Sequence, residues 1–307
     1  MAGDSLRIIC GPTAAGKSRV ALELAEAYDA AIVSADSRQI YCYFDIGTGK
    51  PTREECARVT HYGVDVVEPV DRYSAAQWAA DAEEWIECAW EIDKTPVVVG
   101  GTGLYIKALI TPLFTSPELD PEQRRELARE LDAKPLRDLR TMCEQLDPPR
   151  AHLGRTQLLR AIETVLLAGA RISDLHAEHS ISTAVDTGFD ARYLLIDPGA
   201  SLQSRIESRV DEMIRAGWAD EVRHLIESVP AEAQAWKASG YGLMRDHVEG
   251  KIDLSSARER IIIETRQYAK RQRTWFRHQL PETAVTRLNP DDPRVAVIAR
   301  GWWENAE

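Results

Sequence analysis

The sequence lacks any long apolar run: no stretch reaches the roughly 18 apolar residues from which a membrane-spanning helix is inferred. It also lacks the apolar segment of a signal peptide, because a short run that reads as a β-strand already begins at Leu6. Internal repeats and low-complexity linkers are absent as well. A cytoplasmic protein with no membrane contact is therefore expected.

Cysteine is scarce, with five residues that are widely spaced and odd in number. No C-x-x-C pair occurs, and the seven histidines form no spacing typical of metal ligands. These absences exclude a disulfide framework and a zinc site, and reduced thiols are expected. The cysteines are Cys10, Cys42, Cys56, Cys88 and Cys143.

Basic residues are outnumbered, 38 against 49 acidic ones, and the net charge of −11 argues against a polyanionic partner for the chain as a whole. Residues 258–277 are an exception, with seven basic and two acidic side chains. Such a segment is typical of nucleic-acid binding, although a solvated helix face with ion pairs has the same composition. The basic residues are Arg258, Arg260, Arg266, Lys270, Arg271, Arg273 and Arg277.

The most informative segment present fits the phosphate-binding pattern G-x-x-x-x-G-K-[ST] at every fixed position. A candidate buried strand at 6–10 precedes it, and residues 19–28 repeat apolar side chains at helical spacing. This order presents backbone N–H groups and a lysine to an anion, so a di- or triphosphate should bind, with the Ser18 hydroxyl on a magnesium ion. The segment consists of Gly11, Pro12, Thr13, Ala14, Ala15, Gly16, Lys17 and Ser18.

Short apolar segments alternate with segments of helical periodicity, which predicts an α/β fold: a P-loop NTPase-like parallel sheet flanked by helices. Ligands of such sheets bind outside the carboxyl ends of the strands. The first three strands end at Gly11, Asp36 and Gly100, which should converge on one crevice. The predicted strands are 6–10, 31–35, 96–99 and 191–196.

Residues 115–190 contain no clear strand, but three segments of helical periodicity, at 121–131, 136–146 and 156–168. An all-helical insertion domain is therefore expected there. The P-loop core would consist of residues 1–114 and 191–307, with a helical C-terminal part.

Three further features could carry chemistry. Asp36 could bind magnesium or accept a proton at its strand end, or could cap the next turn. Residues 100–103, Gly-Gly-Thr-Gly, allow close backbone approach to a ligand or make a tight turn. Arg205 and Arg209 share a helix face and could bind a diphosphate, or could pair with acidic neighbours. On these residues alone, a small-molecule kinase would be the commonest outcome.

Four further stretches narrow this choice. They read Asp-Ser-Arg-Gln-Ile-Tyr with Asp-Ile-Gly-Thr-Gly-Lys-Pro (36–41 and 45–51), Gly-Gly-Thr-Gly-Leu-Tyr (100–105), Arg-Ile-Glu-Ser-Arg (205–209) and the basic, aromatic segment 265–277. In this order along the chain they resemble the motifs of bacterial tRNA dimethylallyltransferases. The resemblance implies transfer of a dimethylallyl group from dimethylallyl diphosphate to N6 of adenine 37, beside the anticodon of tRNAs that read codons beginning with U. Magnesium is the implied cofactor, tRNA the partner, and a monomer the expected state.

The resemblance also assigns roles. Residues 11–18 would hold the diphosphate, and Asp36, Thr13 and Arg209 would be catalytic, Asp36 as the base. Near the tRNA it places Asp36, Ser37, Arg38, Gln39, Thr102 and Arg124. Where many family members carry Pro-Asn-Asp-x-Arg-Arg, this chain reads Leu-Gly-Arg-Thr-Gln at 153–157. Arg155, Gln157 and Arg160 are expected to replace those contacts.

Three alternatives stay open on the sequence. One is a related enzyme that prenylates free AMP, and another is a P-loop small-molecule kinase. The third is a nucleotide-binding, RNA-binding module without chemistry.

Overall fold

The chain forms two compact units, one of Met1–Ile110 with Gly188–Glu307 and one of Thr111–Thr187. The structure, a computed structural model, describes residues 5–111, 117, 119–182 and 189–304. The boundary expected between residues 114 and 115 lies outside these residues. Within them, no helix combines the length and the apolar character needed to cross a membrane, and all five cysteines are free thiols.

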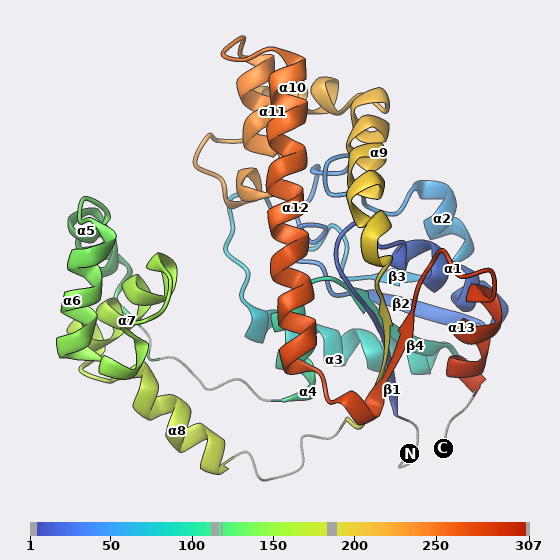
Figure 1. The fold of residues 1–307 in the computed structure, drawn as a ribbon, viewed down its shortest axis with the longest axis horizontal. Helices are drawn as coiled ribbons and strands as arrows, with labels where there is room; N and C mark the ends of the chain where they lie inside the picture. Colours follow the sequence, from blue (N-terminus) through green and yellow to red (C-terminus); the bar gives the residue numbers. More distant parts are fainter. Residues whose placement is uncertain (1–4, 112–116, 118, 183–188, 305–307) are drawn as a thin grey trace. The chain divides into compact units, whose positions relative to one another are not determined.

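A six-stranded parallel sheet forms the centre of the first unit (Figure 1). Its order is β3-β2-β4-β1-β5-β6. The predicted parallel α/β sheet is thus confirmed, with two short strands, β3 and β6, that the sequence did not indicate. The strands are β1 (Leu6–Cys10), β2 (Ala30–Ser34), β3 (His61–Tyr62), β4 (Thr95–Gly100), β5 (Ala191–Ile196) and β6 (Val285–Leu288).

Helices cover both faces of this sheet, which explains why its central strands are apolar throughout. On one face, α1 (Lys17–Ala27) and α13 (Val295–Glu304) pack on a buried cluster that includes Ile9, Val97 and Leu24. On the other face lie α3 (Ala75–Glu91) and α4 (Gly103–Ile110) (Figure 1). There the buried Trp78 stacks on Tyr105 at 4.9 Å and donates its indole N–H to the carbonyl of Ser34 at 3.0 Å.

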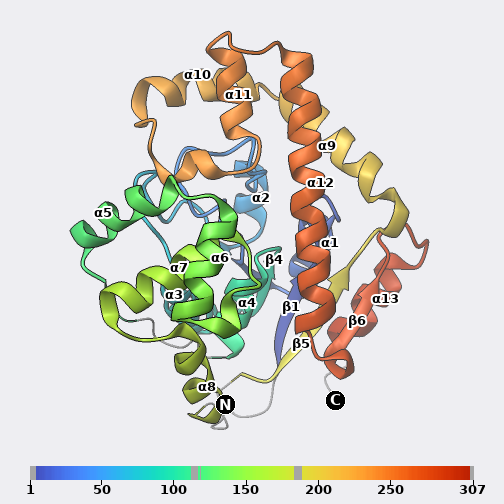
Figure 2. The ribbon, with the colours of Figure 1, turned by 60° about the vertical axis from the view of Figure 1, so that its left-hand side comes forward.

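A long helix, α12 (Leu254–Gln279), connects several parts of this unit (Figures 1 and 2). Asp253 caps its start by accepting from the backbone N–H of Ser256. Its first half packs against α9 (Leu202–Arg215) and α11 (Tyr241–Val248), and α11 in turn packs on α10 (Trp218–Ser228). Farther along, α12 contacts α4 beside the sheet. A short helix, α2 (Arg53–Arg58), follows a Thr52–Glu55 capping box.

Within its described residues, the second unit contains helices and connecting turns but no strand. Its helices are α5 (Pro121–Asp132), α6 (Leu136–Leu146), α7 (Arg155–Ala168) and α8 (Ile172–Ser182). Leu131, Leu139, Leu158 and Ile162 are completely buried in its own apolar core. The periodicity at 121–131, 136–146 and 156–168 indicated the first three of these helices, whereas α8 was not expected.

Gly100 allows two strand ends to approach closely. A Cβ added there would clash with the backbone carbonyl of Ala35, which follows β2. The same Ala35 carbonyl accepts from the N–H of Thr102 at 3.1 Å, so it cannot move away without breaking that bond. The Gly-Gly-Thr-Gly turn therefore joins the ends of β2 and β4 tightly.

We expect Gly100→Ala to lower the free energy of unfolding by about 1–3 kcal/mol, the usual cost of overpacking. Gly242→Ala is the matched control, because a Cβ there meets no atom within 4 Å and alanine favours the helix α11. Denaturant unfolding of both variants checks this. Equal stability of the two variants would contradict the close approach.

Candidate active site

The phosphate loop between β1 and α1 has the conformation that anion binding requires. Gly11, Ala14 and Gly16 all have positive φ angles, of 146°, 61° and 91°. Gly16 caps α1 without any side-chain hydrogen bond, so the first N–H groups of the helix face the loop with no side-chain partner. Gly11 is required sterically, because a Cβ there would clash with the Ile196 carbonyl of β5.

Lys17 folds back over this loop and donates from Nζ to the carbonyl of Pro12 at 2.8 Å. Burial lowers the pKa of Lys17 to about 8, since the charged form loses water. Asp36 raises that pKa and Arg209 lowers it, so both side chains are close to the ammonium group. The protonation state of Lys17 therefore depends on the charged groups around it.

Asp36 lies where the sequence placed it, after β2, and its capping role is confirmed, whereas its catalytic role stays a prediction. Its Oδ1 accepts from the backbone N–H of Arg38 at 2.9 Å, which caps the next turn. It also lines the cavity over the phosphate loop. Arg209, half-buried on α9, lines the same cavity, and burial lowers the pKa of its guanidinium while Asp36 opposes that shift.

The cavity itself measures about 480 Å³, a volume suited to a small ligand. It brings together most of the predicted diphosphate residues, with Asp36, Gln39 and Arg209. Gly11, Pro12 and Ala15 are buried and form the loop behind it. Ser18 is exposed at its rim. The predicted residues that line the cavity are Thr13, Ala14, Gly16, Lys17, Ser18, Asp36, Gln39 and Arg209.

A second, smaller cavity of about 60 Å³ shares Asp36, Thr13 and Arg209 with the first. Tyr268 of α12 lines it, and burial raises the pKa of this tyrosine to about 12, which keeps the hydroxyl neutral. Beside it, Thr102 Oγ1 accepts from the N–H of Ser37 at 3.0 Å. Asp36 therefore lines both cavities.

Gln272 is the principal site residue that the sequence analysis missed. It lies in the basic segment of α12, yet it is buried. Its Oε1 accepts from the backbone N–H of Thr13 at 2.8 Å, and its Nε2 donates to the carbonyl of Gly101 at 2.8 Å. One amide therefore fastens the phosphate loop to the Gly-Gly-Thr-Gly turn. A glutamine in a segment with seven cations carried no periodic signal that could have set it apart.

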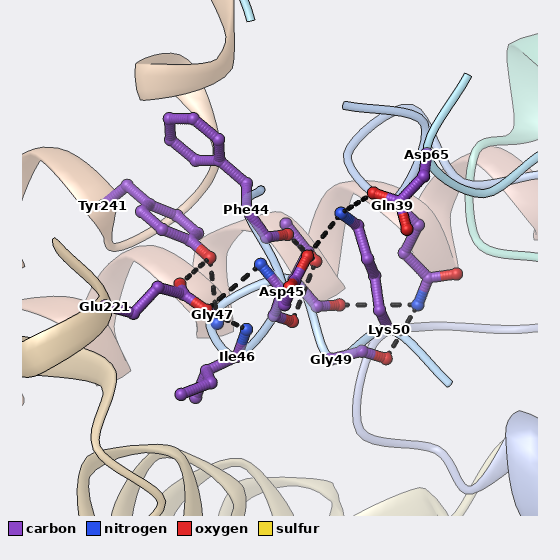
Figure 3. A network of polar contacts seen from close by, with 11 residues as sticks. Gln39, Phe44, Asp45, Ile46, Gly47, Gly49, Lys50, Asp65, Glu221 and Tyr241 are labelled. Carbon is purple, nitrogen blue, oxygen red and sulfur yellow. Dashed lines mark hydrogen bonds and ion pairs between the residues drawn. The ribbon is translucent and has the colours of Figure 1, made fainter. Parts of the chain in front are cut away.

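Gln39, expected near tRNA, lines the cavity and is hydrogen-bonded within the chain. Its Oε1 accepts from Ser34 Oγ at 3.0 Å, and its Nε2 donates to the carbonyl of Gly49 at 2.8 Å (Figure 3). Lys50 lies in the same turn, with only 4% of its side chain exposed, and pairs with Asp45 and Asp65. These hydrogen bonds and ion pairs therefore fix residues 45–50 beside the cavity.

Arg205 and Arg209 separate in the structure. Arg205 pairs with Asp291, a partner distant in sequence, whereas Arg209 lines both cavities. Arg205 is thus paired with an acidic residue, although not with one of its neighbours on the helix, and its guanidinium lies beside Gly16 of the phosphate loop. The diphosphate alternative stays a prediction.

In the second unit, Arg124 pairs with Glu163 at 3.0 Å. Arg155 donates to the carbonyls of Leu131, Asp132 and Lys134 at the end of α5, and Gln157 accepts from the N–H of Gly154. Those bonds stabilise the helical unit itself. Arg160 lies on α7, close enough to Arg124 that their charges interact.

The basic segment of α12 divides into two groups. Arg258 pairs with Asp211, and Arg273 pairs with Asp197, so these two cations join elements within the core. Arg266, Lys270 and Arg277 are exposed and form no ion pair within the described part of the chain. The prediction of ion pairs is confirmed for Arg258 and Arg273, whereas nucleic-acid binding by the exposed cations stays a prediction.

The comparisons agree with one another. The family model "IPP transferase" matches residues 39–279, and the model "Isopentenyl transferase" matches residues 4–65. A "tRNA dimethylallyltransferase" of Cyanothece sp. is 37% identical over 295 residues, covering 94% of each chain. A solved tRNA isopentenylpyrophosphate transferase of Staphylococcus epidermidis is 30% identical with a TM-score of 0.67 and covers 96% of each chain.

A eukaryotic dimethylallyltransferase solved while acting on tRNA is 23% identical, with a TM-score of 0.76 over 99% of this chain and 76% of its own. That likeness concerns the fold. Because the family match spans most of the chain and the Cyanothece relative is similar along nearly its whole length, this chain belongs to the IPP transferase family.

Proposed function

We propose that this protein transfers a dimethylallyl group from dimethylallyl diphosphate to N6 of adenine 37 in tRNAs that read codons beginning with U. The observation that carries the proposal is the meeting of a phosphate loop, a carboxylate and a half-buried arginine in one cavity, in a chain of this family. The five free thiols suit a reducing cytoplasm, where we place the enzyme as a monomer.

In the reaction, the bond from adenine N6 to C1 of the prenyl group forms while the bond from C1 to the diphosphate oxygen breaks. Charge then grows on the leaving diphosphate, and the α1 amides, Lys17 and Arg209 stabilise it. Asp36 accepts the proton that N6 loses. Thr13, whose N–H is held by Gln272, places its side chain beside the same oxygens.

Magnesium fits this site as a companion of the substrate. Within the described residues there is no group of three or more histidine, cysteine or acidic side chains that could hold a metal ion. Magnesium commonly binds through substrate phosphates and few protein ligands, and Ser18 at the start of α1 would supply a hydroxyl. When bound, the ion neutralises charge on the diphosphate.

For tRNA recognition we propose two sets of residues. Ser37, Arg38 and Thr102 adjoin Asp36 and would contact the target nucleotide. In the second unit, Arg124 and Arg160 would contact tRNA phosphates, as positively charged side chains generally do. Arg155 and Gln157 would act on the same surface by fixing the end of α5 and the start of α7.

The direct test offers labelled dimethylallyl diphosphate with tRNA, with AMP and without acceptor. Label in tRNA, located at adenine 37 by mass spectrometry, is the expected result. Label in AMP alone would instead identify an adenylate prenyltransferase, and phosphate transfer from ATP without prenyl transfer would identify a kinase.

We expect Asp36→Asn to lower kcat by about 10²- to 10⁴-fold, the span usual for a general base. Asparagine keeps an oxygen for the Arg38 N–H, so the turn survives while the proton acceptor is lost. Single-turnover kinetics with saturating tRNA measure this. Unchanged turnover would remove Asp36 from the mechanism.

Donor binding should depend on the protonation of Lys17, whose pKa is about 8. Only the ammonium form attracts the diphosphate, so KM for the donor should be constant below pH 8 and rise about tenfold per pH unit well above it. Lys17→Arg is the control, because arginine stays charged and its profile should remain flat. Parallel profiles for the two proteins would refute this assignment.

The exposed cations of α12 should contribute to tRNA affinity. We expect Arg266→Ala with Lys270→Ala to reduce the slope of log affinity against log salt by about two. Arg58→Ala with Lys94→Ala is charge-matched, and these two cations pair with Glu26 and Asp29 and do not line the cavity. Filter binding over a range of salt checks this, and equal slopes for both double variants would make α12 an ordinary solvated face.

A further inference from the structure

Hydrogen bonds to residues of α10 and α11 hold the turn at residues 45–50. Neither helix lines the cavity over the phosphate loop. Glu221 of α10 accepts from the backbone N–H groups of Asp45 at 3.2 Å and Ile46 at 2.7 Å (Figure 3). Both bonds end on the same oxygen, Oε2. The other oxygen, Oε1, accepts from the hydroxyl of Tyr241 on α11 at 2.6 Å.

Tyr241 completes the attachment. Its hydroxyl accepts from the N–H of Gly47 at 3.0 Å while it donates to Glu221, so three consecutive N–H groups end on one carboxylate–phenol pair. The ring is fully buried and packs against Phe44 at 4.8 Å and Trp218 at 5.3 Å. Gly47 itself has no room for a side chain, because a Cβ there would clash with Trp218. The start of the turn is therefore fixed by hydrogen bonds and by packing.

The end of the same turn reaches the cavity. Thr48, Gly49 and Lys50 line it. A Cβ added at Gly49 would clash with the guanidinium of Arg209, which means that this arginine lies directly against the backbone of the turn. From the opposite side, Gln39 donates to the carbonyls of Thr48 and Gly49. The position of the Gly49 backbone thus limits where the Arg209 guanidinium can lie.

We propose that Glu221 and Tyr241 are positioning residues of the diphosphate site, which hold the 45–50 turn so that Gly49 keeps the Arg209 guanidinium beside Asp36. The inference rests on the proposed function. It gives a reason for an acidic side chain in a partly buried place. Glu221 accepts from three donors, two of them N–H groups of the turn and the third the Tyr241 hydroxyl, which itself binds the turn.

Two conservative variants test it. Tyr241→Phe keeps the ring but removes the hydroxyl that accepts from Gly47 and donates to Glu221. Glu221→Gln replaces one carboxylate oxygen by an NH2 group, so the acceptor for either Tyr241 or the turn is lost. Each should raise KM for dimethylallyl diphosphate by about 3- to 10-fold, the range expected for losing one or two such hydrogen bonds, and should also lower kcat, because Arg209 stabilises the charge that grows on the leaving diphosphate.

A double-mutant cycle then asks whether the effect passes through Arg209. In an Arg209→Ala background, Tyr241→Phe should change KM for the donor by less than about twofold, because the group that it positions is gone. An undiminished effect in that background would overturn the proposal. So would a lower melting temperature of either variant with unchanged KM, since that is the signature of a purely structural pair.

Tyr28→Phe is the matched control, because Tyr28 also donates to a carboxylate, Glu304, but at the end of α1 remote from the cavity. It should leave KM unchanged, and an equal rise in KM in this control would count against the proposal. Failure of the proposed function looks different: the unaltered protein would then transfer no prenyl group to tRNA. An active protein whose variants keep their KM rejects only the role of Glu221 and Tyr241.

Discussion

The arrangement of two cations around one carboxylate is the constraint on which the site depends. Lys17 and Arg209 both interact with Asp36, and both lose water in the same cavity, so these three groups carry a net positive charge where they are poorly hydrated. Burial of unbalanced charge is costly, and the lowered pKa of Lys17 expresses that cost. The diphosphate of the proposed donor would supply the missing negative charge and so complete the site electrostatically.

The surrounding bonds keep this unfavourable arrangement in place. Gln272 fastens the phosphate loop to the end of β4, and Gly11 and Gly100 let neighbouring backbones approach where a side chain would collide. Glu221 and Tyr241 fix the turn that faces Arg209. Each of these contacts fixes a backbone segment rather than a ligand, which is how donors and charges are oriented before a reaction begins.

Local patterns predicted much of the fold. Continuous apolar runs marked β1, β2, β4 and β5, and helical spacing marked the longer helices, because both signals arise within a few residues. The strand β3 has only two residues, and β6 includes the exposed Arg287, so neither forms an apolar run. Contacts within the site were harder to predict from the sequence. Arg205 pairs across 86 positions with Asp291, and Gln272 reaches Thr13 across 259, distances over which spacing carries no information.

The insertion of the second unit between α4 and β5 has a consequence for synthesis of the chain. The strand β5 lies next to β1 in the middle of the sheet, and its last residue, Ile196, packs against Gly11. During synthesis the phosphate loop therefore gains its contact with Ile196 only after the entire insertion and β5 have emerged, and its bond to Gln272 later still. A chain that ends within the insertion has all eight loop residues but lacks both contacts.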